Sequence, residues 1–351
     1  MVNPRTAAIA AGAHTMKNAI LILGEAYGET EERQKRPFVG TTGYELTRLL
    51  NEAGIRRADC YLTNVFNLRP PGNKIEEFCG PKAQAIPLYP ALVRSMYVRK
   101  EFESELDRLK EELDNIDPNV VVAMGNTACW ALLGKTTIGS LRGVTAISTH
   151  TLTGFKVLPT YHPAAIFRNY PIRPIVVMDL VKAKRESEHS TIKRPKREVW
   201  IDPTIEDIER FRDDYIQGCN LLSVDIETSG NQVTMLGLAP SRSRSLVIPF
   251  SRAGRNYWPT PALERKAWQI SKDILADPGI PKVFQNGLYD IAFLWRSAGL
   301  AVYGAEQDTM LLHHALQPES IKDLGFLGSV YTDEGAWKRM RGKRTTIKRD
   351  D

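Results

Sequence analysis

Short apolar runs alternate with amphipathic stretches along the first half of the chain. Four runs have the length and composition of buried strands, and helical patterns separate them. They cover residues 19–23, 60–65, 120–124 and 155–159. The stretch 98–116 is rich in Glu, Lys and Leu, which predicts a long amphipathic helix that ends before Pro118. This order predicts an α/β fold with a largely parallel sheet.

The pattern changes between residues 182 and 198, which are polar, contain Ser187, Ser190 and Pro195, and lack apolar periodicity. A chain of 351 residues is long enough for two domains that each bury a core. We therefore expect an N-terminal extension (1–17), a first domain (18–185), a basic linker (186–198), a second domain (199–337) and a basic tail (338–351).

An apolar strand at 221–228 opens the second half and carries Asp225 and Glu227. Residues i and i+2 of a strand point to the same face. Two adjacent carboxylates repel unless a cation lies between them, so this pair suits the two-metal cleavage of phosphodiesters. Asp290 follows Asn286 by four residues, at the start of a predicted helix.

Composition and charge narrow the class of protein. Apolar residues make up 42% and charged residues 25%, and no run of about 18 apolar residues offers a membrane span. The net charge is +6, with basic residues crowded at 182–197 and 338–349, which favours a phosphate backbone; a solvated linker and tail is the alternative. Four scattered cysteines fit a reducing cytosol without disulfides.

Four segments of the first half carry a family resemblance. They are Gly-Glu-Ala-Tyr-Gly at 24–28, Arg-Pro-Phe-Val-Gly at 36–40, Leu-Thr-Asn-Val at 62–65 and Tyr-His-Pro-Ala-Ala at 161–165. In this order they resemble the uracil-DNA glycosylase superfamily, above all its thermophile-type branch. The resemblance implies a three-layer α/β/α sheet and an enzyme that flips a base out of DNA and hydrolyses its N-glycosidic bond.

The resemblance also implies roles for single residues. Phe38 stacks on the base, Asn64 pairs with O4 and N3–H of uracil, and His162 donates to O2 as negative charge develops there. Glu25 orients the water, although Tyr27 stands where the family usually has proline. The remaining implied contacts are to DNA. They are backbone approach to phosphates at Gly28, Gly40 and Gly43, an apolar wedge of Ile166 and Phe167, and a cation at Arg168.

The thermophile-type enzymes hold an iron-sulfur cluster on four cysteines. Only Cys79 stands at an expected distance, and one cysteine holds no cluster. We therefore expect no iron-sulfur cluster, a colourless protein, and no cofactor for base excision.

The second half resembles the DEDD-type 3'-5' exonuclease domain of phage-type family A DNA polymerases, through the strand 221–228, the segment 284–290 and the segment 308–324. The resemblance implies a partial ribonuclease H-like fold with Mg²⁺ or Mn²⁺ on Asp225, Glu227 and Asp290. The third family motif is absent, because Tyr331 is followed four residues later by Gly335.

Together these features predict a uracil-DNA glycosylase linked to an incomplete proofreading domain, acting on uracil-containing single-stranded or primer-template DNA beside a polymerase domain or chain. Its expected location is the cytoplasm, that of the bacterial host if a phage encodes it. Two alternatives stay open. The first domain is a catalytically silent uracil or DNA-binding module of a replication complex, or the exonuclease is completed by a separate chain.

Overall fold

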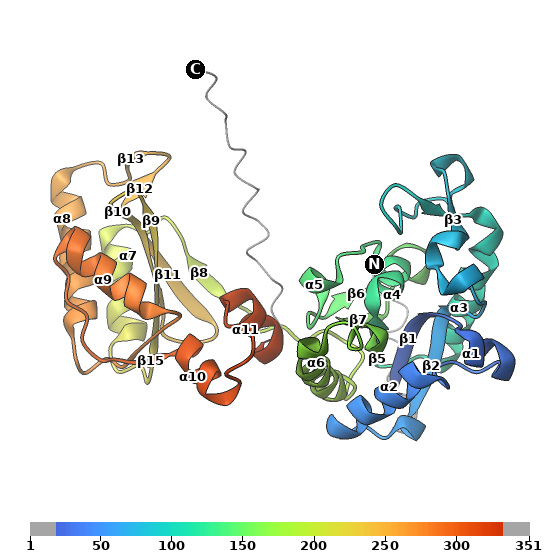
Figure 1. The fold of residues 1–351 in the computed structure, drawn as a ribbon. Helices are drawn as coiled ribbons and strands as arrows, with labels where there is room; N and C mark the ends of the chain where they lie inside the picture. Colours follow the sequence, from blue (N-terminus) through green and yellow to red (C-terminus); the bar gives the residue numbers. More distant parts are fainter. Residues whose placement is uncertain (1–18, 333–351) are drawn as a thin grey trace, which may run out of the picture. The chain divides into compact units, whose positions relative to one another are not determined.

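The computed structural model describes residues 19–332, which form two compact units (Figure 1). Unit 1 comprises residues 19–192 together with 328–332, and unit 2 is Lys193–Leu327. The expected extension at 1–17 and the basic tail at 338–351 lie outside the described residues. Among the described helices, none is both long and apolar enough to cross a membrane.

A five-stranded sheet forms the centre of unit 1, in the order β2-β1-β5-β7-β6. Its strands are β1 (Ile20–Ala26), β2 (Cys60–Phe66), β5 (Val120–Met124), β6 (Ala146–Ile147) and β7 (Lys156–Thr160). All neighbours are parallel except β6, which runs antiparallel to β7. Each of the four predicted apolar runs forms one of the parallel strands, so the predicted α/β sheet is confirmed.

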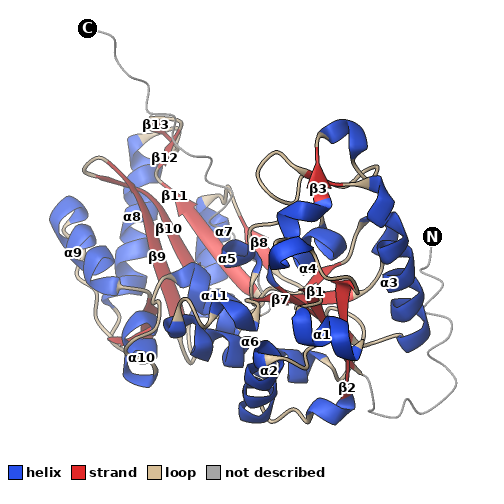
Figure 2. Cartoon of the chain, turned by 45° about the vertical axis from the view of Figure 1, so that its right-hand side comes forward, coloured by secondary structure: helices blue, strands red, loops and turns tan. Residues whose placement is uncertain are grey.

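Helices cover both faces of this sheet because β1 sends alternate side chains to opposite sides. Leu21 and Leu23 pack into a core with α3 (Glu103–Ile116) and α4 (Gly125–Leu133). Ile20 and Ile22 pack into a second core with α2 (Thr41–Glu52) and α6 (Arg173–Glu186). Figure 2 shows these helices around the central strands. The three-layer architecture is the predicted one.

The predicted helix at 98–116 is shorter in the structure. Val98 is buried in β4 (Tyr97–Val98), which pairs with β3 (Cys79–Gly80), and α3 begins only at Glu103. The helix ends as predicted, with Asp117 in the left-handed conformation before Pro118. The remaining helices of unit 1 are α1 (Glu29–Gln34), α5 (Ile138–Leu141) and short 3-10 turns such as η3 (Arg57–Asp59) and η9 (Pro163–Ala165).

Unit 2 has a six-stranded sheet in the order β15-β14-β9-β10-β11-β8. The strands are β8 (Glu198–Trp200), β9 (Leu222–Ser229), β10 (Gln232–Ala239), β11 (Arg244–Pro249), β14 (Lys282–Phe284) and β15 (Ala305–Asp308), and β12 (Ser251–Arg252) pairs with β13 (Arg255–Asn256). The helices are α7 (Ile205–Phe211), a π-helical turn (Arg212–Ile216), α8 (Pro261–Ala276), α9 (Gly287–Ala298) and α10 (Thr309–Leu316).

Helix α11 (Leu324–Tyr331) begins in unit 2 and ends in unit 1. Residues 328–332 group with unit 1, and the expected limit of the second domain at residue 337 stays a prediction. The physical reason for this grouping is hydrogen bonding within unit 1, where Arg142 donates to the Ser329 hydroxyl (2.7 Å) and Lys182 donates to the Ser329 carbonyl (3.2 Å).

Candidate functional site

Phe38 lies in the turn between α1 and α2, with its ring buried and a positive φ of 54°. This backbone conformation is uncommon for a residue with a Cβ, so surrounding contacts must hold it. Arg57 donates from Nη2 to the Phe38 carbonyl oxygen at 2.7 Å. Gly43 lacks the Cβ that would otherwise lie 1.8 Å from the same oxygen. The Phe38 ring stacks near the His162 ring, with centroids 6.0 Å apart.

Gly24 brings Phe38 and Asn64 together at the carboxyl end of β1. The parallel register pairs Gly24 with Asn64 on β2. A Cβ on residue 24 would lie 2.2 Å from Asn64 Oδ1 and 2.6 Å from Phe38 Cζ, so a side chain there displaces both groups. This function of Gly24 was not predicted, although its place as the first residue of the segment 24–28 was an available signal.

The Asn64 backbone is fixed from outside the site. Arg108 on α3 donates to the carbonyl oxygens of Asn64 (2.9 Å) and Val65 (3.0 Å) and pairs with Glu112 at 2.6 Å. Asn64 is only 3% exposed, and its side-chain amide has no hydrogen-bond partner within residues 19–332. Its donor and acceptor therefore remain available to a ligand.

His162 directly precedes η9 and accepts a hydrogen bond at Nδ1 from the Ala164 N–H (3.3 Å). Burial and the nearby Arg168 guanidinium lower the pKa of His162 to about 4. The ring is therefore neutral near pH 7, and because Nδ1 accepts, its proton sits on Nε2. Gly125 (φ 87°) leaves room for it, since a Cβ there would lie 3.1 Å from the His162 Cβ.

Glu25 is the acidic residue nearest the end of β1, and the Thr127 hydroxyl donates to its Oε2. Burial raises the pKa of Glu25, while the bond from Thr127 opposes that rise. Tyr27 is buried, and its backbone N–H donates to the Leu68 carbonyl at 3.1 Å. The family usually has proline at this position, and proline has no backbone N–H. Tyr27 therefore makes a backbone hydrogen bond that proline would lack.

Two of the three glycines expected at DNA phosphates have other partners. The Gly40 N–H donates to Glu31 Oε1 at 2.9 Å, and the Gly43 N–H donates to the Gly40 carbonyl at 2.9 Å. In this structure the Gly40 amide is therefore occupied by a side chain of α1 and the Gly43 amide by the first turn of α2, so their phosphate contacts stay predictions that require these bonds to be exchanged. Gly28, which precedes α1, stays a prediction.

Only part of the apolar wedge predicted at Ile166 and Phe167 is exposed. Ile166 is 3% exposed and packs in the core against α2 and α6, so it does not enter DNA. Phe167 is 58% exposed and Arg168 is exposed. These two residues remain the predicted wedge and cation.

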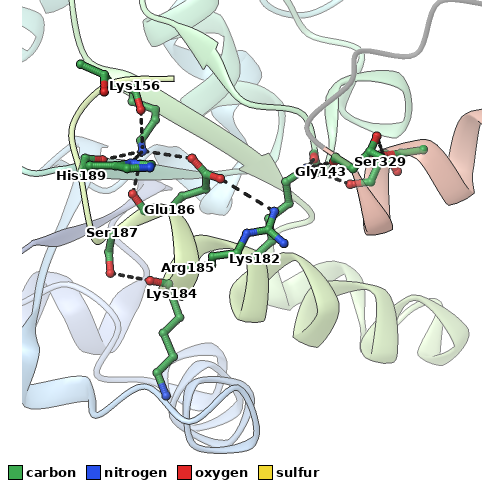
Figure 3. A network of polar contacts seen from close by, with 12 residues as sticks. Gly143, Lys156, Lys182, Lys184, Arg185, Glu186, Ser187, His189 and Ser329 are labelled. Carbon is green, nitrogen blue, oxygen red and sulfur yellow. Dashed lines mark hydrogen bonds and ion pairs between the residues drawn. The ribbon is translucent and has the colours of Figure 1, made fainter. Parts of the chain in front are cut away.

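The basic stretch 182–197 divides into a buried and an exposed part. Lys182 lies in α6 and is buried, and its Nζ donates to the carbonyls of Gly143 (2.7 Å) and Ser329 (3.2 Å). Figure 3 shows these bonds, and shows Lys156 donating to Glu186 and His189. Lys182 is thus occupied by contacts within the protein rather than free for DNA, and of the expected linker 186–198 only Glu186 belongs to helix α6.

Three of the cysteines are buried in separate elements of unit 1. Burial raises the pKa of Cys60 in β2 and of Cys129 in α4 to about 12, and that of Cys79 in β3 to about 11. These thiols stay protonated near neutral pH, and the thiolate is the form that binds metal.

The carboxylates expected to hold metal in unit 2 lie on two elements. Asp225 and Glu227 alternate with buried Val224 and Ile226 along β9 and share its exposed face. Asp290 on α9 is buried and accepts a hydrogen bond from the Ile226 N–H at 3.2 Å. Burial and the negative charge of Asp225 raise the pKa of Asp290 to about 6.

Asp225, Glu227 and Asp290 stay the predicted metal ligands. Within the described residues, no three side chains of His, Cys, Asp or Glu lie close enough together to hold a metal ion. One oxygen of Asp290 accepts the bond from the Ile226 amide. Asp308 opens the segment 308–324, which resembles the exonuclease family. It accepts hydrogen bonds from the backbone amides of Asn286 (3.1 Å) and Gly287 (2.7 Å) and so caps α9.

Comparison with known proteins gives each unit a relative. Residues 12–178 match the family model of the uracil DNA glycosylase superfamily, and residues 206–335 match that of a 3'-5' exonuclease. The type-4 uracil-DNA glycosylase of Saccharolobus solfataricus is 35% identical over 181 residues, which are 49% of this chain and 73% of the relative.

Two further similar proteins are matched over a smaller share of their own length. The DNA polymerase of Bacillus phage SP01 is 22% identical over 331 residues, 86% of this chain but 33% of the polymerase. A crystal structure of the EXD2 exonuclease domain soaked in Mg is 19% identical, with a TM-score of 0.26, and covers 34% of this chain and 59% of that chain. The chain thus spans less than two thirds of either protein.

The sheet carries Asn64 and His162 at its carboxyl edge, and the matching glycosylase family model covers both residues. Together with the similar type-4 enzyme, this defines the class of unit 1 as a DNA glycosylase. The chain belongs to the uracil-DNA glycosylase superfamily, with a 3'-5' exonuclease domain in its second half. The predicted resemblance and two-domain architecture are confirmed.

Proposed function

We propose that unit 1 hydrolyses the N-glycosidic bond of deoxyuridine in DNA. The observation that carries this proposal is that the buried Phe38 ring lies beside both the Asn64 amide, which has no side-chain partner within residues 19–332, and the neutral His162 ring. Residues from three distant segments meet there, each with the chemistry that a uracil ring requires.

Recognition follows from the donors and acceptors of Asn64. Its amide N–H₂ donates to uracil O4, and its Oδ1 accepts from N3–H. Cytosine presents an amino group and an unprotonated N3 at these positions, so it leaves both Asn64 groups unpaired. Phe38 offers the apolar surface on which the flipped base stacks.

The leaving group is a uracil anion, whose charge develops on O2. The proton on His162 Nε2 is placed to donate to that oxygen, and a neutral ring donates without a prior deprotonation step. Glu25 orients and deprotonates the attacking water, a task that its raised pKa favours. Phe167 and Arg168 enter the duplex at the vacated position.

Three single-stranded oligonucleotides that differ in one base, uracil, cytosine or thymine, test this proposal. The protein should release free uracil in the presence of EDTA and release neither of the other bases. Chromatography of the supernatant detects the base. Equal release of cytosine would contradict the assigned pairing of Asn64.

For unit 2 we propose a weak exonuclease that binds Mg²⁺ or Mn²⁺ loosely through Asp225, Glu227 and Asp290. Among residues 19–332, no three acidic, histidine or cysteine side chains lie close enough together to hold a metal ion, which supports weak binding because two-metal chemistry requires ligands fixed around both ions. Similarity to a phage DNA polymerase supports uracil-containing primer-template DNA as the substrate, with a polymerase domain or chain as partner in the cytoplasm of a bacterial host.

A further inference from the structure

We infer that Arg57 is a positioning residue for base excision, which holds the Phe38 platform in place through the Phe38 carbonyl. The inference rests on the proposed uracil excision and adds a residue outside the motifs that carry it. Arg57 does not act on the base itself; its effect reaches the base through the backbone of Phe38.

The contacts of Arg57 connect the Phe38 turn to the first turns of α2. Its Nη2 donates to the Phe38 carbonyl at 2.7 Å, and its Nη1 donates to the Gly43 carbonyl and to the Thr47 hydroxyl, both at 3.1 Å. One planar guanidinium therefore fixes three oxygens at once. A lysine ammonium has no such fork, so it does not reproduce this geometry.

All three acceptors are neutral. No carboxylate within residues 19–332 forms an ion pair with Arg57, which is half-buried. Burial and the neighbouring Arg36 lower the pKa of Arg57, so the surroundings disfavour a cation there. A cation kept in such a place without an acidic partner is explained by the geometry of its hydrogen bonds.

Phe38 needs this support because its φ is 54°. The ring meets Gly24 on one side and His162 on another, so a small rotation of the backbone moves the platform relative to both. Without the bond from Arg57, the turn relaxes toward negative φ and the ring leaves the site. The chemical step then slows because the base is misplaced.

A different function for Arg57 is direct contact with DNA. A cavity of about 490 Å³ lies beside it, lined in part by Arg36, Pro37 and Tyr61. If Arg57 bound a DNA phosphate there, its loss would weaken DNA binding and reduce the salt dependence of binding. Positioning predicts a loss of rate with little change in affinity, so the two functions separate in one set of measurements.

The variants are Arg57→Ala and Arg57→Lys, with Arg56→Ala as the matched control, because Arg56 is exposed and pairs with Asp59. Single-turnover excision from a uracil oligonucleotide should fall about tenfold or more in both Arg57 variants, while the Kd for the oligonucleotide changes less than about twofold. The control should match the parent. A Kd that rises with a reduced salt slope would overturn the inference in favour of a phosphate contact.

A double-mutant cycle with Phe38→Ala separates positioning from a general structural effect. If Arg57 acts through Phe38, Arg57→Ala should reduce the rate no further in a Phe38→Ala background. Equal losses in both backgrounds would show that Arg57 acts independently of the platform.

A readout that does not depend on activity completes the test. In protein labelled with 4-fluorophenylalanine, the Phe38 ¹⁹F resonance is assigned by its loss in Phe38→Leu. That resonance should shift or broaden in Arg57→Ala and stay unchanged in Arg56→Ala. An unchanged resonance would overturn the inference, whereas a parent protein that releases no uracil would contradict only the proposed function.

Discussion

Phe38 and His162 lie 6.0 Å apart between ring centroids, with their planes 28° from parallel. They come from segments far apart in the sequence, one after α1 and the other after β7. The parallel sheet brings these segments together beyond the carboxyl ends of its strands, which is where such sheets bind ligands.

Gly24→Ala should disable the site without unfolding the protein. The added methyl would lie 2.2 Å from Asn64 Oδ1 and 2.6 Å from Phe38 Cζ, so both side chains must move. We expect the single-turnover excision rate to fall on the order of 100-fold. Gly139→Ala is the matched control, since its Cβ would only contact Tyr161 at 3.6 Å. Wild-type excision by the Gly24 variant would contradict the close approach.

His162 should make stability depend on pH. The folded pKa is about 4, below the ordinary 6.5, so between these values the unfolded state binds a proton that the folded state does not. The free energy of unfolding therefore falls as the pH drops from 6.5 toward 4, by roughly 1 to 2 kcal/mol from this group between pH 7 and 5. Urea titrations should show a smaller fall in His162→Gln. Equal falls in both proteins would show that His162 titrates normally.

The two parts of the basic stretch should behave differently. Lys182→Met leaves buried carbonyls unpaired, so it should lower the free energy of unfolding by roughly 2 kcal/mol and leave the salt dependence of DNA binding unchanged. Neutralising the exposed Lys193, Arg194 and Lys196 to Gln should instead flatten that salt dependence. A slope that stays the same in the triple variant would mean that these residues do not touch DNA.

Unit 2 should digest a 3' end poorly, because among residues 19–332 no three acidic, histidine or cysteine side chains lie close enough together to hold a metal ion. The comparison uses single-stranded DNA with Mn²⁺, this chain and its Asp225→Ala variant, because two-metal cleavage requires ligands fixed around both ions. Fast digestion by the 351-residue chain that Asp225→Ala abolishes would show that another residue completes the site.

Much of the fold could be predicted because its signals are local. The strands β1, β2, β5 and β7 are short apolar runs, and Pro118 marks where α3 ends. The predicted start of α3 was wrong because Val98 pairs with Cys79 in a short strand. Pairing between distant residues leaves no periodic signal in so short a segment. Lys182 was misjudged for a similar reason, since its carbonyl partners come from 39 and 147 residues away.

The site was predicted in part, through residues that resemble family motifs. Asn64, Phe38 and His162 do come together, whereas Ile166 packs in the core although it belongs to the same segment as exposed Phe167. Which residue of an apolar pair faces the core depends on the tertiary fold. Arg57 and Arg108 were missed because their effect lies in bonds to backbone carbonyls, which carry no residue identity.

Base excision itself is tested most directly with an end-labelled oligonucleotide that contains one uracil. The oligonucleotide is incubated with excess protein in EDTA and is then treated with alkali. The account predicts complete strand cleavage at the uracil, with Asn64→Ala and His162→Ala each slowed on the order of 100-fold or more. An oligonucleotide that binds the protein yet stays resistant to alkali after long incubation would contradict the account, and would identify unit 1 as a silent DNA-binding module.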